Sequence, residues 1–176
     1  MKLKHNRFER YKSPVFIETG SYCGEGIEGA ITANFKTIYS IELSEHYYKV
    51  CQELFKGNKN VHLLFGDSVE VLPKLLKTLD CQCTFWLDGH WCGDVSAGES
   101  NPVPLMEELQ AIKEHHRKDH IILIDDMRLL RTHDAEWKDL KYSVLDLEKM
   151  LRSINPQYNI FYESGVTPDD VLIAHL

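Results

Sequence analysis

The feature that most constrains the fold of this chain is a short apolar run that ends on a carboxylate and occurs five times. The acids that close the five runs are Glu18, Glu42, Asp67, Asp88 and Asp125, and Asp126 follows the last of them. Apolar runs of this length are typical of buried parallel strands. The carboxyl ends of such strands meet at one edge of a sheet, where open α/β sheets bind their ligands. We therefore expect these carboxylates to lie along one functional edge.

Stretches with helical periodicity separate the apolar runs and complete the predicted fold. The expected strands are 15–18, 37–43, 61–65, 83–87, 120–125, 158–162 and 171–176. The pattern predicts an α/β fold, with a doubly wound, mostly parallel seven-stranded sheet, a C-terminal antiparallel hairpin and helices on both faces. We divide the chain into a basic N-terminal arm, 1–13, and a single domain, 14–176.

Two polar stretches predict loops at the functional edge. They run from Trp91 to Val103 and from Arg128 to Lys138. The candidate substrate-binding residues in these loops are Trp91, Arg128, His133 and Trp137. An aromatic residue in a surface loop also serves as a local packing anchor, and this alternative stays open. The helix after the second loop is expected to carry an apolar stripe that starts at Leu140 and to stop at Pro156.

Composition limits the partners that this protein is expected to bind. The chain has 176 residues and a formal net charge of -7, and its only local basic excess lies in the arm 1–13. Nucleic-acid-binding proteins need a basic face, so we expect a solvated arm and no nucleic-acid partner. No apolar run reaches the ~20 residues that cross a bilayer, and residues 1–7 lack the apolar segment of a secretory signal. We expect a cytoplasmic protein with no membrane partner and reduced cysteines.

A glycine-rich segment follows the first expected strand. Residues 24–29 match G-x-G-x-x-G, the fingerprint of dinucleotide-binding folds. In that fingerprint the first glycine follows the strand directly, whereas here Glu18, Thr19 and Gly20 occupy the strand exit. The offset argues against a nicotinamide cofactor. A P-loop is excluded because no Gly-Lys-Ser/Thr sequence follows.

Segment 18–26, Glu-Thr-Gly-Ser-Tyr-Cys-Gly-Glu-Gly, resembles the first motif of class I S-adenosylmethionine (AdoMet) methyltransferases. The resemblance implies that Glu42 accepts hydrogen bonds from the ribose hydroxyls and that Asp67 and Ser68 contact adenine. The implied cofactor-binding set is Glu18, Thr19, Gly20, Ser21, Gly24, Glu42, Asp67, Ser68 and Asp88. Its glycines would let the backbone approach the ligand. Two plainer interpretations stay open, namely Glu42 as an exposed acid at a strand end and Asp67 as a helix N-cap.

The acids after the fourth and fifth expected strands suggest a second ligand. Asp88, Asp125 and Asp126 would converge from adjacent strands, and clustered carboxylates are stabilised by a cation such as Mg²⁺. The pattern resembles metal-dependent O-methyltransferases of the macrolide- and aminocoumarin-type sugar family, and catechol-type enzymes more distantly. The resemblance implies Mg²⁺ or another divalent cation, held by these three acids, that binds and activates a substrate hydroxyl.

The segment after Asp88 departs from that family at two points. His90 stands where the family has the second acid of an Asp-Gly-Asp turn, and Trp91 and Cys92 stand where catechol-type enzymes keep a basic lysine. We name His90 and Asp88 as candidate catalytic residues, because an imidazole accepts a proton near neutral pH. His90 as a fourth metal ligand or second-shell partner, or as a structural turn residue, remains an alternative.

Cys81, Cys83, His90 and Cys92 offer zinc-binding side chains without the spacing of a zinc site. The strand between the two pairs spans about 17 Å at ~3.3 Å per residue, so one ion cannot bind both pairs. We expect Cys81 and Cys83 to be buried or near-surface thiols. The pair His115 and His116 closes a helix, where solvation and compensation of the helix dipole explain it better than a metal does.

The function predicted from these patterns is an AdoMet-dependent methyltransferase that acts on a small-molecule or sugar hydroxyl with the help of a divalent cation. A non-catalytic nucleotide- or AdoMet-binding module is one alternative, and a nicotinamide-dependent oxidoreductase is the other. No inserted domain shapes the acceptor pocket, so we expect the pocket to be short or to be completed by a second subunit of a homo-oligomer.

Overall fold

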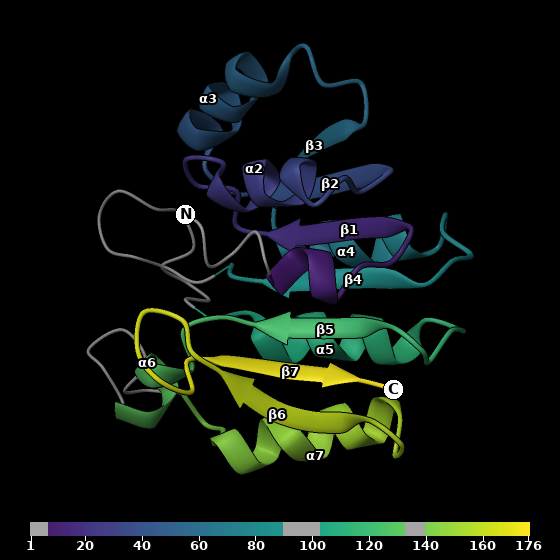
Figure 1. The fold of residues 1–176 in the computed structure, drawn as a ribbon, viewed down its shortest axis with the longest axis vertical. Coiled ribbons are helices and arrows are strands. Elements are labelled where there is room, and N and C mark those ends of the chain that lie inside the picture. The colour runs from purple at the N-terminus through teal and green to yellow at the C-terminus, as the bar shows by residue number, and fades with distance from the viewer. Residues whose placement is uncertain (1–6, 90–102, 133–139) are drawn as a thin grey trace.

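The computed structural model describes residues 7–89, 103–132 and 140–176, which form one seven-stranded sheet with helices on both faces (Figure 1). The strands are β1 (Val15–Thr19), β2 (Thr37–Glu42), β3 (Val61–Phe65), β4 (Cys83–Leu87), β5 (Ile121–Ile124), β6 (Asn159–Glu163) and β7 (Val171–His175). Their order in the sheet is β3-β2-β1-β4-β5-β7-β6. The first five strands are parallel, and β7 runs antiparallel to β5 and β6. The predicted fold class is confirmed.

Two layers of helices cover the sheet. The helices are α2 (Glu25–Thr32), α3 (Glu45–Phe55), α4 (Ser68–Leu76), α5 (Leu105–Glu114), α6 (Met127–Thr132) and α7 (Val144–Ile154). Apolar side chains of α4, α5 and α7 belong to the hydrophobic core on one face, while those of α2 and α3 belong to the core on the other. None of the helices in the described ranges combines the length and hydropathy that a membrane crossing would require.

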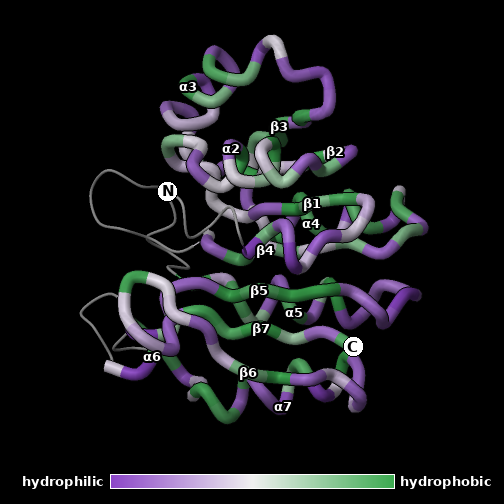
Figure 2. Tube along the Cα trace, viewed as in Figure 1, coloured by the Kyte–Doolittle hydropathy of each residue, from purple (hydrophilic) through white to green (hydrophobic). Residues whose placement is uncertain are grey.

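Burial on both faces explains why the strands read as continuous apolar runs. Every residue of β1 and β4 is buried, and Figure 2 shows hydrophobic positions along β5 and β7. The strand order reverses between β1 and β4, which is the switch point where open sheets bind ligands. At this point Glu18 and Thr19 of β1 lie beside Trp86 and Leu87 of β4. The register therefore brings the exits of the two central strands together.

Two helices differ from the sequence prediction. Helix α6 occupies residues 127–132, where we expected a loop. Helix α7 begins at Val144 rather than at Leu140. Its start is set by a capping box, in which the Ser143 side chain accepts a hydrogen bond from Asp146 N and the Asp146 carboxylate accepts one from Ser143 N.

The described part of the N-terminal arm packs on the sheet instead of being solvated. Residues 7–10 form one helical turn, and the Phe8 ring is fully buried, with its centroid 4.8 Å from that of Phe16 and 5.1 Å from that of Trp86. Arg7 is also buried, and its Nε lies 3.1 Å from Oε2 of Glu163. The expectation of a solvated arm is wrong for residues 7 and 8, because an aromatic side chain there completes the core. Residues 1–6 lie outside the described ranges.

Two buried histidines form a hydrogen-bonded chain at the opposite edge of the sheet from the carboxylates. Cys83 N donates to Nδ1 of His120 (3.1 Å), so the His120 proton is on Nε2, which lies 2.8 Å from Nδ1 of His115. The Nε2 of His115 lies 3.1 Å from the Leu79 carbonyl oxygen. Burial lowers the pKa of His120 to about 4. The solvated role expected for His115 is therefore wrong, while exposed His116 pairs with Asp80.

The two strand cysteines lie as expected. Cys83 is buried and Cys81 is partly buried, and both are free thiols. Burial raises the pKa of the Cys83 thiol well above its usual range, which keeps it protonated and unreactive.

Candidate active site at the carboxyl edge of the sheet

Glu18, at the end of β1, is buried and is held from two sides. Its Oε2 accepts a hydrogen bond from the Ser40 hydroxyl of β2 (2.5 Å), and that hydroxyl lies 2.6 Å from the hydroxyl of Ser21. A Cβ on Gly26 would stand 1.7 Å from Oε1 of Glu18. The Glu18 carboxylate therefore packs against the first turn of α2, in the space that a side chain at residue 26 would take. A dinucleotide-binding fold would hold a phosphate close to this end of the helix.

Gly20 and Gly24 are required by contacts within the protein. Gly20 has a φ of 80°, and a Cβ there would lie 2.6 Å from the carbonyl oxygen of Asp88. Gly24, the N-cap of α2, has a φ of 86°, and its Cβ would lie 2.6 Å from the Phe55 ring. We expected these glycines to make room for a ligand. Contacts within the protein also require glycine at both positions, because the backbone there is left-handed and closely packed, at Gly20 between the exits of β1 and β4. The prediction of ligand approach stays a prediction.

Glu42, at the end of β2, is fixed by two backbone donors. Its Oε2 accepts a hydrogen bond from Tyr22 N (2.9 Å), and its Oε1 accepts one from Ser44 N (2.7 Å). The residue is only 7% exposed, so the interpretation as an exposed strand-end acid is wrong. An ionised carboxylate has about four lone-pair sites, and these two bonds leave acceptor capacity for a ligand at the switch point.

Asp67 and Ser68 are engaged at the start of α4. Asp67 is the N-cap of this helix, and its Oδ1 accepts a hydrogen bond from Val69 N (2.9 Å). The Ser68 hydroxyl points inward and donates to Oε1 of Glu108 (2.6 Å). The N-cap interpretation of Asp67 is thus confirmed, and the Ser68 side chain serves the interior of the protein.

Glu108 is a buried carboxyl group that the sequence prediction missed. It is 1% exposed, and its burial raises its pKa to about 7. It lines a small pocket together with Gly89, Val103 and Asp125. The buried hydroxyl of Thr19, at the β1 exit, faces the Glu108 carboxyl group, and this contact opposes the effect of burial on the pKa of Glu108.

A signal for Glu108 was present in the sequence. Leu105, Leu109 and Ile112 form the apolar stripe of α5, and residue 108 falls on the same face of the helix. An acid on the buried face of a helix needs a hydrogen-bonding or charged partner, so its position in the stripe indicates a polar contact inside the protein.

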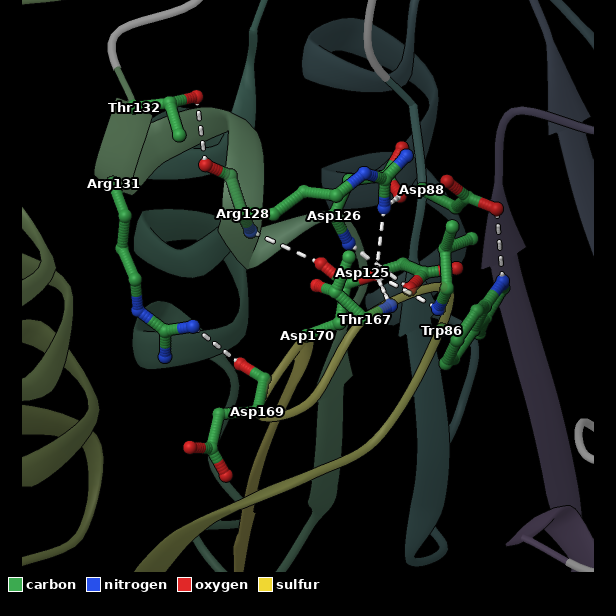
Figure 3. A network of polar contacts seen from close by, with 11 residues as sticks. Trp86, Asp88, Asp125, Asp126, Arg128, Arg131, Thr132, Thr167, Asp169 and Asp170 are labelled. Carbon is green, nitrogen blue, oxygen red and sulfur yellow. Dashed lines mark hydrogen bonds and ion pairs between the residues drawn. The ribbon is translucent and has the colours of Figure 1, made fainter.

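The acids after β4 and β5 are held by different contacts. Trp86 donates from Nε1 to Oδ2 of Asp88 (3.2 Å), so this indole holds the Asp88 side chain (Figure 3). Asp125 accepts from the backbone N–H of Asp126 through Oδ1 (3.0 Å). Asp126 has a φ of 60°, in the left-handed region. The two adjacent acids are therefore separated by a sharp backbone turn.

Arg128 joins Asp126 to Asp170, an acid just before β7. Its Nη1 forms ion pairs with Oδ1 of Asp126 and with Oδ2 of Asp170, the latter at 2.6 Å (Figure 3). Asp170 is completely buried. Burial lowers the pKa of the guanidinium, but the two carboxylates outweigh burial, and the net pKa of Arg128 is raised.

The acids that come together differ from the predicted metal ligands. In the described part of the chain, Asp125, Asp126 and Asp170 have ligand atoms within 4.8 Å of one another, and Asp88 is not in this group. Of the predicted ligands Asp88, Asp125 and Asp126, the structure brings Asp125 and Asp126 together, with Asp170 as the third acid. The three clustered acids do not fit an open cation site, because Arg128 is paired with two of them.

Several candidate residues lie outside the described ranges. They are His90, Trp91, His133 and Trp137. Of the four predicted substrate-binding residues, Arg128 alone lies within the described ranges, and it sits among the acids at the β5 exit.

No family model matches the sequence, and the search of curated proteins finds no match. Solved structures do match over nearly the whole chain. The methyltransferase PaMTH1 of Podospora anserina, with S-adenosylhomocysteine bound, matches with a TM-score of 0.65 and 16% identity over 98% of this chain and 76% of its own. The O-methyltransferase TomG of Streptomyces achromogenes, with S-adenosylmethionine bound, matches with a TM-score of 0.63 and 13% identity over 99% and 78%.

The chain has the Rossmann-like methyltransferase fold. An O-methyltransferase from Bacillus cereus, in complex with S-adenosylhomocysteine, matches with a TM-score of 0.65 and 12% identity over 99% of this chain and 79% of its own. These identities are low, so the likeness concerns the fold. The predicted resemblance to this class of structures is nevertheless confirmed at that level.

Proposed function

We propose that this protein is an AdoMet-dependent methyltransferase that methylates a hydroxyl oxygen of a small molecule. The observation that carries the proposal is the Glu42 carboxylate, buried at the β2 exit beside the glycine-rich loop and held by Tyr22 N and Ser44 N. A carboxylate fixed in this way is suited to accept hydrogen bonds from two adjacent hydroxyls of a ribose. The likeness to structures that contain AdoMet or its demethylated product supports the same cofactor.

The charge of the glycine loop favours AdoMet over a dinucleotide. A nicotinamide cofactor would need its diphosphate at the N-terminus of α2, and the Glu18 carboxylate beside the first turn of that helix would repel it. AdoMet carries a positive sulfonium and an amino-acid group instead of a diphosphate. The buried carboxylates of Glu18 and Glu42 at the proposed cofactor site thus argue against a nicotinamide-dependent oxidoreductase.

The described residues at the strand exits would have different roles in binding the cofactor and the acceptor. Glu42 would bind the ribose, and the loop held by Glu18, Ser40 and Ser21 would present its backbone to the cofactor. Bound AdoMet supplies a methyl group that an oxygen nucleophile displaces from sulfur. The small pocket lined by Gly89, Glu108 and Asp125 lies between the β4 and β5 exits, next to the proposed acceptor side of the site. His90 as the proton acceptor remains a prediction.

Two finer predictions from the sequence belong to this proposal, and the ion pairs of Arg128 argue against a third. The first is a sugar as the acceptor, and the second is a cytoplasmic homo-oligomer. The third is a divalent cation, and no step is assigned to it here, because Arg128 pairs with two of the three clustered acids. Activity with and without a chelator, measured on a panel of hydroxyl compounds, tests the first and third predictions.

Calorimetry with AdoMet and S-adenosylhomocysteine tests the proposal. Wild-type protein should bind both, and Glu42→Gln should weaken binding by about 1 to 3 kcal/mol, because it removes charged acceptors from the ribose. Glu53→Gln is the matched control, since Glu53 is exposed on α3 and should leave affinity unchanged. Failure of the wild type to bind either compound would contradict the cofactor, and stronger binding of NADH would favour the oxidoreductase.

A further inference from the structure

The exit of β5 holds an arginine among its clustered acids. We infer that the Arg128 guanidinium is the resident cation of this site, taking the position that a divalent metal would need, so that the protein works without one. That the protein works without a divalent metal rests on the proposed function. The ion pairs themselves do not depend on that function.

Both the guanidinium and the backbone N–H of Arg128 are bound to neighbouring acids. Nη1 pairs with Asp126 and with Asp170, and the backbone N of Arg128 donates to Oδ1 of Asp170 (3.0 Å). A further backbone bond runs from Met127 N to the carbonyl oxygen of Asp170 (2.9 Å). The start of α6 is thus fixed on Asp170, and the arginine side chain turns back over the same carboxylate.

Asp170 has little capacity left for a metal ion. Its Oδ2 accepts from Val166 N (2.9 Å) and Thr167 N (3.4 Å) in addition to Arg128, and its Oδ1 accepts from Arg128 N. These four donors match the roughly four lone-pair sites of a carboxylate. A divalent cation would have to displace the guanidinium and compete with backbone donors that hold the loop before β7.

The energetics of buried charge explain why one cation excludes the other. Asp170 is fully buried, and a buried carboxylate is strongly destabilised unless a positive group pairs with it. Arg128 meets that need from within the chain. Without its guanidinium, Asp126 and Asp170 would lose the cation that they share. Closely spaced carboxylates attract a hard cation. Removal of Arg128 should therefore create a metal site.

Mn²⁺ titration of metal-free protein, followed by the electron paramagnetic resonance signal of free Mn²⁺, tests the inference. The wild type should leave the signal unchanged at millimolar Mn²⁺. Arg128→Met should bind Mn²⁺ at least about tenfold more tightly than the wild type. Arg131→Met is the matched control, because Arg131 lies on the same helix and bonds to Asp169 O outside the acid cluster, and it should behave as the wild type.

Thermal unfolding provides the second readout, in case Arg128→Met is poorly folded. Mn²⁺ should raise the unfolding temperature of Arg128→Met and leave that of the wild type unchanged. The unfolding temperature of Arg128→Lys should also not change with Mn²⁺, because lysine supplies a positive charge at the same position. Tight Mn²⁺ binding by the wild type would overturn the inference, as would an Arg128→Met variant that binds no better than the wild type. Neither readout requires AdoMet, so a failure of the proposed cofactor would be seen separately by calorimetry.

Discussion

Oε1 of Glu18 lies 1.7 Å from the point where a Cβ of residue 26 would stand, so Gly26 and Glu18 occupy one shared space. The acid closes β1, and the glycine belongs to the first turn of α2. The carboxylate enters the end of the helix only because residue 26 has no side chain. The G-x-G-x-x-G match in the sequence therefore has a structural meaning that differs from phosphate binding.

Gly26→Ala should destabilise the protein by about 1 to 3 kcal/mol, because the added methyl group overlaps a buried carboxylate that cannot move aside without losing Ser40. Urea unfolding measures the change. Gly57→Ala is the control, since a Cβ at residue 57 meets nothing within 4 Å and should have little effect. Equal stabilities of the two variants would refute the shared-space interpretation.

Glu108→Gln should remove a pH dependence of stability. Burial raises the pKa of Glu108 from 4.5 to about 7, so the folded state binds a proton that the unfolded state has already released above pH 4.5. The stabilising effect is complete below that pH and is lost as the pH rises through about 7. Between pH 5 and pH 8 the wild type should lose about 2 kcal/mol relative to Glu108→Gln, as measured by urea unfolding at each pH. A free energy of unfolding that changes equally with pH in the wild type and in Glu108→Gln would contradict the raised pKa.

His120→Leu should remove a pH dependence of the opposite sign. Burial lowers the pKa of His120 from 6.5 to about 4, so the unfolded chain takes up a proton first as the pH falls. The stabilising effect is present above pH 6.5 and is lost as the pH falls toward 4. Relative to the variant, the wild type should lose about 1 to 2 kcal/mol between pH 7 and pH 5. His116→Asn, at the exposed neighbour, should keep the wild-type behaviour.

Phe8→Ala should cost about 3 to 5 kcal/mol of stability, because it empties a fully buried site between Phe16 and Trp86. Phe65→Ala is the matched control, since the Phe65 side chain is 53% exposed. A small effect at residue 8 would mean that the arm is detached in solution, as its charge alone suggests.

The alternation of apolar runs and helical stretches was sufficient to predict the sheet. The runs of β1, β4 and β5 are buried on both faces, apart from the partly buried Ile121, so hydrophobicity alone marks these three strands. The acids at the strand exits followed from that placement, because parallel strands end at one edge. Glu42 and Asp67 lie where this reasoning expected them.

The partners of those acids were beyond the reach of local patterns. Asp170 meets Arg128 across 42 positions of the chain, and Ser68 meets Glu108 across 40. Such pairs depend on how the hairpin and α5 dock on the sheet, which periodicity does not encode. The prediction of a solvated basic arm was wrong for a similar reason. The charged residues of the arm indicated a solvated segment, while the burial of Phe8 depends on packing against the sheet.

The bond from Arg128 N to Asp170 has a consequence for the order in which the site is assembled during synthesis. The cofactor side of the edge uses residues from β1, β2 and α4, which leave the ribosome early. The acid that holds Arg128 is translated 42 residues after it, just before β7. In a nascent chain, the residues proposed to bind AdoMet are thus available first, while the acids that pair with Arg128 are brought together only when β7 inserts beside β5.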